Sequence, residues 1–90
     1  MQQNITTIDT SLHDYNHHSD ISKKLGYIVA VISEFAKSYN MSTRETANYL
    51  VAFKGIDFLV NHYEAEHLLS IEDCVDDVMQ VCKNNGGSVK

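Results

Sequence analysis

The side chains best suited to chemistry lie in one short stretch in the second half of the chain. Between Gly55 and Ser70 the sequence brings imidazole, phenol and carboxyl groups together within a few helical turns. His62 and Glu66 are one turn apart, a spacing at which two helix side chains could share a zinc ion. His62 and His67, however, project roughly 140° from each other around a helix. The His-Glu-x-x-His spacing is absent, so we expect no metal centre and no cofactor.

A tyrosine and a histidine one turn apart belong to the apolar side of this stretch. An advance of about 100° per residue places Tyr63 and His67 on the face that also carries Ile56. We expect the His67 ring to pack in the core with one ring nitrogen hydrogen-bonded, because a histidine on an apolar face is more often structural than catalytic. Since histidine changes charge near neutral pH, Tyr63 and His67 are our candidates for a structural contact or a pH-sensitive switch.

The two cysteines offer no catalytic or redox pair. Cys74 and Cys82 are eight positions apart in one predicted helix, which separates them by about 12 Å along its axis. A disulfide cannot close that gap. Both fall on the apolar side, where free cysteine acts as a small hydrophobe, and a reduced cytoplasmic setting fits. Because no glycine-flanked serine and no glycine-rich phosphate loop occurs either, we expect no catalytic residue and no enzyme.

Four acidic residues on the last predicted helix form the candidate partner-binding surface. They are Glu72, Asp73, Asp76 and Asp77. Such a face can simply keep a small protein in solution, or it can steer a basic partner by long-range attraction. The sequence leaves both interpretations open.

Length and charge limit the classes of function. A chain of 90 residues allows one small core and leaves little room for a separate catalytic shell. The net charge of -5 repels a phosphate backbone, so we expect no nucleic acid partner. No run of about 18 apolar residues occurs, and residues 1–10 lack a basic start and an apolar segment. We therefore expect neither a membrane span nor an export signal.

Helical periodicity accounts for most of the chain. Apolar residues recur every three or four positions from Ile21 to Tyr39, which predicts the first and most apolar helix. Its apolar arc is wider than one face requires, so this helix is either central to a bundle or shared with a partner chain. Ser42 begins Ser-Thr-Arg-Glu, the spacing of a capping box, and opens a second helix. Gly55 is expected to end that helix in the left-handed conformation.

The remaining boundaries complete an all-α fold. A third helix is predicted to run to about Leu68, and Ser70 is predicted to cap a fourth that ends before Gly86. Residues 1–19 form a polar leader that we expect to be flexible, residues 20–87 the helical domain and residues 88–90 a tail. No segment alternates with the period of a strand. The prediction is a compact bundle of about four short helices.

Short motifs along these helices resemble a known bacterial family. The motifs are Glu34-Phe35-Ala36, Ser42-Thr43-Arg44-Glu45, Asn48-Tyr49-Leu50, Gly55-Ile56-Asp57-Phe58-Leu59 and the stretch from Tyr63 through His67 to Ser70-Ile71. From about Leu25 to Gly87 the chain is similar to the family catalogued as domain of unknown function 3791. The resemblance implies a small helical protein with no established activity, often encoded beside an ADP-ribosyltransferase-like toxin. It thereby implies an accessory or antitoxin-like role.

We therefore expect a small, acidic, non-catalytic module that binds another protein. The partner would be a basic or toxin-like protein, with a homodimer as a further arrangement. A metal- or ligand-binding regulator is one alternative, and metal retained on purification or a thermal shift with a small molecule would reveal it. Another is a DNA-binding regulator of the antitoxin type, whose contacts would come from Lys23, Lys24 and Arg44.

Overall fold

The computed structural model describes the backbone of residues 11–88 and the side chains of residues 21–88. Within this range the chain forms helices and no strand. The helices are α1 (Ser11–Ser38), α2 (Thr43–Ala52), α3 (Gly55–Asn61), α4 (Tyr63–Glu66) and α5 (Ile71–Asn84). The predicted all-α class is confirmed. The expectation of a flexible leader falls partly outside the described residues, and residues 11–19 belong to α1, which begins well before Ile21.

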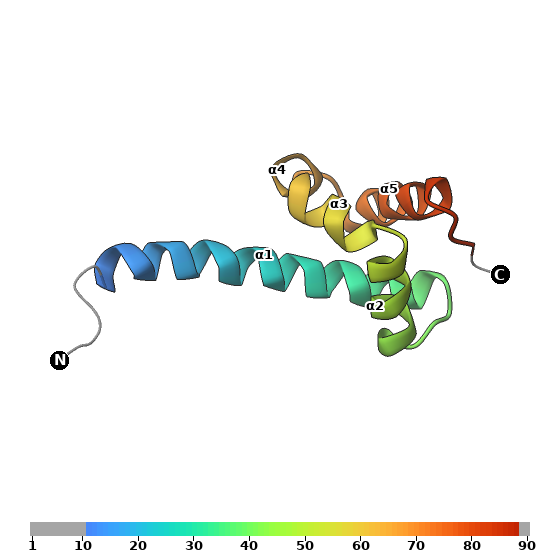
Figure 1. Cartoon of the computed structure of the whole chain (residues 1–90), viewed down its shortest axis with the longest axis horizontal. Helices are drawn as coiled ribbons and strands as arrows, with labels where there is room; N and C mark the ends of the chain where they lie inside the picture. The colour runs from blue at the N-terminus through green and yellow to red at the C-terminus, as the bar shows by residue number, and fades with distance from the viewer. Residues whose placement is uncertain (1–10, 89–90) are drawn as a thin grey trace.

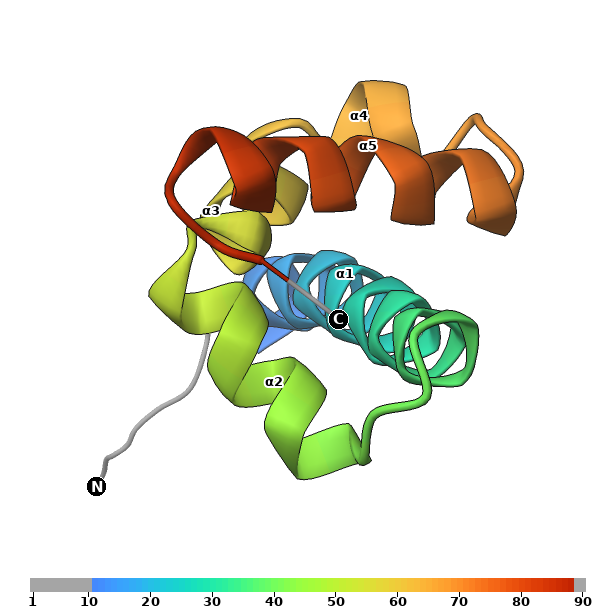
Figure 2. The ribbon, with the colours of Figure 1, turned by 90° about the vertical axis from the view of Figure 1, so that its right-hand side faces the viewer.

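Helix α1 sets the overall shape. Its 28 residues make a rod of about 42 Å at roughly 1.5 Å per residue, and the molecule measures 55 × 25 × 21 Å. The carboxyl-terminal half of α1 lies against the other helices, whereas its amino-terminal part extends past them (Figure 1). Figure 2 looks along α1 and shows α2 below it and α5 above it. No helix among the described residues is both long and apolar enough to cross a lipid bilayer.

The core lies where α2, α3 and α5 meet the carboxyl-terminal half of α1. Each of these helices contributes fully buried side chains, which include Val31, Phe35, Leu50, Leu59, Cys74, Val78 and Cys82. Aromatic rings extend the core toward the α1–α2 turn, where the Phe35 ring lies 4.7 Å from Tyr39 and 5.9 Å from Tyr49. The two cysteines are buried and unbridged, as their apolar positions predicted.

Both predicted helix caps are present. The Ser42 side chain accepts a hydrogen bond from the Glu45 amide at 3.0 Å, and the Ser42 amide donates to Glu45 Oε1 at 2.9 Å. This is the complete capping box, worth about 1 kcal/mol in typical helices. At the start of α5 the Ser70 hydroxyl accepts from the Asp73 amide at 3.1 Å. Hydrogen bonds between near neighbours therefore define two of the helix starts.

The junction between α2 and α3 differs from the prediction for Gly55. The left-handed residue is Lys54, with φ 73°, whereas Gly55 is the first residue of α3 and is buried. A Cβ atom on Gly55 would lie 2.9 Å from Leu50 Cδ2, 3.1 Å from Cys82 Sγ and 3.2 Å from Val78 Cγ1. Glycine is thus required here because α3 packs directly on α2 and α5, and the backbone turn itself is made by lysine.

The predicted third helix is interrupted at His62. This residue has φ -118° and ψ 23°, and it separates α3 from the single turn of α4. The buried side of the segment is the one that carries Leu59, so Val60 is 49% exposed while Glu66, seven positions after Leu59, is only 7% exposed. His67 is exposed, and the prediction that its ring packs in the core is wrong. The titratable side chain that points inward from this segment is a carboxyl group one residue earlier.

Two glycines offer a matched test of this packing. Gly55→Ala should destabilise the protein by about 1–3 kcal/mol, because the added methyl group overpacks a well-filled contact. Gly26→Ala should stabilise it by about 0.5–1 kcal/mol, because nothing lies within 4 Å of that position and alanine favours helix. Urea denaturation of both variants measures the changes in free energy of unfolding. Equal shifts for the two variants would contradict the close approach at Gly55.

Candidate functional site

An exposed apolar surface lies along the middle of α1. We call it the α1 stripe and define it as Ile21, Leu25 and Val29, which are 43%, 57% and 60% exposed. Their spacing of four residues places them on one side of the helix. Side chains of this size are normally covered by another element when they form a continuous row. The stripe is therefore a surface that the described fold leaves without a neighbour.

The same side of α1 is covered at its other end. Ile32 and Ala36 continue the row at helical spacing, with Ile32 half-buried against the core and Ala36 7% exposed. Helix α2 crosses α1 steeply at this end and does not run along it toward the stripe (Figure 1). The apolar side of α1 thus extends beyond its contact with α2.

The predicted acidic surface is present on α5. Glu72, Asp73, Asp76 and Asp77 are all exposed on the side of α5 opposite its buried residues. Nearby, the connection from α4 to α5 exposes Leu68 by 78% and Leu69 by 42%. The structure therefore gathers these four acids on one helix face beside two solvent-facing leucines.

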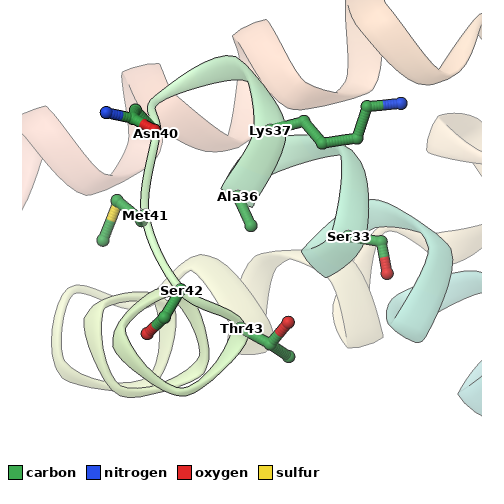
Figure 3. A pocket seen from close by; sticks show the side chains of 7 residues that line it. All are labelled: Ser33, Ala36, Lys37, Asn40, Met41, Ser42 and Thr43. Atoms are coloured by element: carbon green, nitrogen blue, oxygen red, sulfur yellow. The ribbon is translucent and has the colours of Figure 1, made fainter.

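A hollow lies where α1 turns into α2. Its volume is about 490 Å³, and it is lined by Ser33, Ala36, Lys37, Asn40, Met41, Ser42 and Thr43 (Figure 3). The hollow is open to solvent, and the Lys37 amine, which lies 3.8 Å from Glu34 Oε1, is 77% exposed at the side-chain level. No acid, histidine or cysteine belongs to this lining. Lys37 supplies a positive charge to this lining, so the hollow could hold a small polar or anionic molecule.

A buried polar cluster connects α1, α4 and α5. We call it the Glu66 cluster and define it as Tyr27, Glu66, Cys74 and Asp77. The Tyr27 hydroxyl donates a hydrogen bond to Cys74 Sγ at 3.0 Å. Glu66 is 7% exposed, and its Oε1 atom is buried without a hydrogen-bond partner. Buried carboxyl oxygens are normally paired, so this one marks an unusual site.

Burial raises the pKa of three of these groups, Tyr27, Glu66 and Cys74, whereas Asp77 is exposed on α5. Burial raises the pKa of Glu66, and contact with Asp77 raises it further, while Cys74 and His62 lower it in part. Burial also raises the pKa of the Cys74 thiol to about 11 and that of Tyr27 above its ordinary value. A protonated, fully buried thiol is a poor nucleophile. The cluster therefore lacks the activated nucleophile that covalent catalysis requires.

The two switch candidates from the sequence lie at the edge of this cluster. The Tyr63 and His67 rings stack at 4.6 Å with an interplanar angle of 5°, and His67 Nδ1 lies 2.8 Å from the Tyr63 carbonyl oxygen. The Tyr27 ring meets Tyr63 edge-on at 5.5 Å, and the Lys24 amine sits 5.5 Å from the centre of the Tyr63 ring. Tyr63 and His67 thus form a surface contact between α4 and α1.

Sequence reasoning missed Glu66 because it centred the inward side of this segment on Ile56, Tyr63 and His67, whereas the structure buries Gly55 and Leu59. Glu66 is seven positions after Leu59 and so lies on the same side of a helix, which is the signal that could have found it. The metal interpretation considered for His62 and Glu66 finds no support in the geometry, since no group of three or more His, Cys, Asp or Glu side chains within the described range could hold an ion.

The Tyr27 hydroxyl can be tested by its removal. Tyr27→Phe should lower the free energy of unfolding by about 0.5–1.5 kcal/mol near neutral pH, because the bond to Cys74 Sγ is lost. A phenol with a raised pKa contributes stability at low pH and loses it as the pH rises. The difference from wild type should therefore shrink above about pH 10. Urea denaturation across this range measures both effects, and an unchanged stability at neutral pH would refute the bond.

Comparison with known proteins places the chain in a family. No curated protein and no solved structure matches it. Residues 26–85 match the family model described as Protein of unknown function (DUF3791), and the chain therefore belongs to that family, as its short motifs predicted.

Proposed function

We propose that this protein is a non-catalytic module that binds another protein through the α1 stripe. The supporting observation is that one side of α1 is buried at its carboxyl-terminal end and exposed at Ile21, Leu25 and Val29. A row of apolar side chains at helical spacing is the surface that helix-in-groove recognition uses. A partner would bury the stripe by packing next to α2 on the same side of α1.

The chemistry of the interior supports a binding role over an enzymatic one. The Glu66 cluster holds a thiol and a phenol with raised pKa values, and both are kept protonated by burial. The hollow at the α1–α2 turn is lined by no acid, histidine or cysteine. The described residues thus support binding through exposed surfaces better than they support catalysis.

The partner that we propose is basic and toxin-like. Four exposed acids on α5 would attract a positively charged surface and speed its approach. An antitoxin-like role, implied by the sequence resemblance, is one form of this function. Co-expression with the product of the adjoining gene tests that form directly, because relief of toxicity should require the α1 stripe.

A photo-crosslinking residue tests the stripe in the native host. Placed at Leu25, it should give one defined crosslinked product, because this side chain would lie inside the interface. The matched control is Ala30, which is also exposed on α1 but projects roughly 140° away. The product's mass separates a different protein from a second copy of the chain. Equal crosslinking at the two positions, or none at either, would refute the stripe as the interface.

The stripe can also be disrupted by charge. Leu25→Glu should weaken binding by about tenfold or more, because the interface would bury an unpaired carboxylate. Ala30→Glu adds the same charge to the same helix and should leave affinity unchanged. Titration calorimetry with the partner measures both, and circular dichroism verifies that each variant stays folded. An equal loss in the two variants would point to net charge and away from the stripe.

The acidic face makes a separate prediction about rate. Replacing Glu72, Asp73 and Asp76 with their amides should slow association by about tenfold at low salt and have little effect at high salt, because exposed charges act through a screened field. Asp77 is left intact because it contacts Glu66. Glu64→Gln, a single exposed carboxyl on α4, serves as the control. A salt-independent association rate in the wild-type protein would exclude steering.

A further inference from the structure

Glu66 is buried in a way that ordinary packing does not explain. It is 7% exposed, and among the described residues the ion pairs are Lys37 with Glu34 and Lys54 with Asp57, so Glu66 has no basic partner there. Its Oε1 atom has no hydrogen-bond partner. Folding has therefore placed a carboxyl group inside the protein with nothing to neutralise a negative charge.

The groups that face Glu66 come from every neighbouring element. Helix α5 contributes the Asp77 carboxyl and the Cys74 thiol, and α1 contributes the Tyr27 hydroxyl. His62, at the α3–α4 junction, also acts on Glu66, whereas the Lys24 amine lies over the Tyr63 ring. These neighbours include a second carboxyl group and no lysine or arginine that pairs with Glu66, so they favour the neutral form of Glu66 over the charged one.

The segment that carries Glu66 is weakly held. Helix α4 has four residues and no side-chain cap, and the helical path is broken before it at His62. After it, Leu68 and Leu69 face solvent. Local opening needs little free energy where few apolar contacts hold a segment in place. A negative charge left unpaired on the buried Glu66 could supply such an amount.

We propose that residues 62–70 form a proton-controlled flap, which is closed on α1 and α5 while Glu66 is protonated and opens when Glu66 loses its proton. Closing takes up a proton, because the pKa of Glu66 is higher in the closed state than in the open one. The closed state is therefore favoured at low pH and loses stability as the pH rises through the raised pKa of Glu66. Neither the flap nor its test involves the partner proposed for the α1 stripe.

Amide hydrogen exchange followed by NMR measures this opening residue by residue. In the closed flap the Glu66 amide donates to the His62 carbonyl oxygen at 2.9 Å, and the His67 amide donates to the Tyr63 carbonyl oxygen at 3.0 Å. After correction for intrinsic exchange, protection of these amides should fall as the pH rises through the raised pKa of Glu66, by about tenfold for each unit by which the closed flap raises that pKa. Protection of the Val78 amide in α5 should stay constant.

Two variants assign the effect to one carboxyl group. Glu66→Gln cannot ionise, so protection of the flap should be independent of pH and remain at the low-pH level. Glu64→Gln removes an exposed carboxyl from the same helix and should behave as wild type. If wild-type protection does not change with pH, or if Glu66→Gln loses protection as wild type does, the flap is refuted.

A third variant keeps the proposal testable if Glu66→Gln fails to fold. Asp77→Asn removes the like charge but leaves Glu66 buried, so the midpoint of the protection change should move to lower pH. The same midpoint should appear in the titration of the Glu66 side-chain carboxyl carbon by NMR. A midpoint that Asp77→Asn leaves in place, or a Glu66 carboxyl that titrates at its ordinary value in the folded protein, would overturn the proposal.

Discussion

Contact of the apolar face of α5 with α1 and α3 is the interaction on which the rest of the structure depends. Cys74, Val78 and Cys82 are fully buried along this face, and the start of α3 approaches it so closely that only Gly55 fits. Once α5 is oriented by this contact, its acidic side must face solvent. The turn of α4 that precedes it is then held over Tyr27, which brings Glu66 inside.

The features that could be predicted from sequence are those set by near neighbours. The Ser42 and Ser70 caps and the buried cysteines follow from helical periodicity and from hydrogen bonds three residues apart. The packing role of Gly55 could not be predicted from sequence, because its neighbours Val78 and Cys82 come from a distant part of the chain. Glu66 and not His67 faces inward because the Leu59 side of this segment packs on the core, and that choice depends on α1 and α5, which are distant in sequence.

Two parts of α1 differ in how well other helices cover them. The turns of α1 around Val31 and Phe35 pack against α2, α3 and α5 and form the core of this short chain. The turns around Leu25 present apolar side chains without a covering element. The first part holds the helices together, and the second supports the proposed role in binding.

The length of α1 has a consequence for how that contact would form. A short isolated helix is marginal in water because its first turn is costly to nucleate. In this protein the nucleus is supplied by the buried turns around Val31 and Phe35, so helical structure propagates outward from the core into the segment that bears Leu25. An incoming molecule would meet a recognition helix that is already wound, and association would lose little backbone entropy.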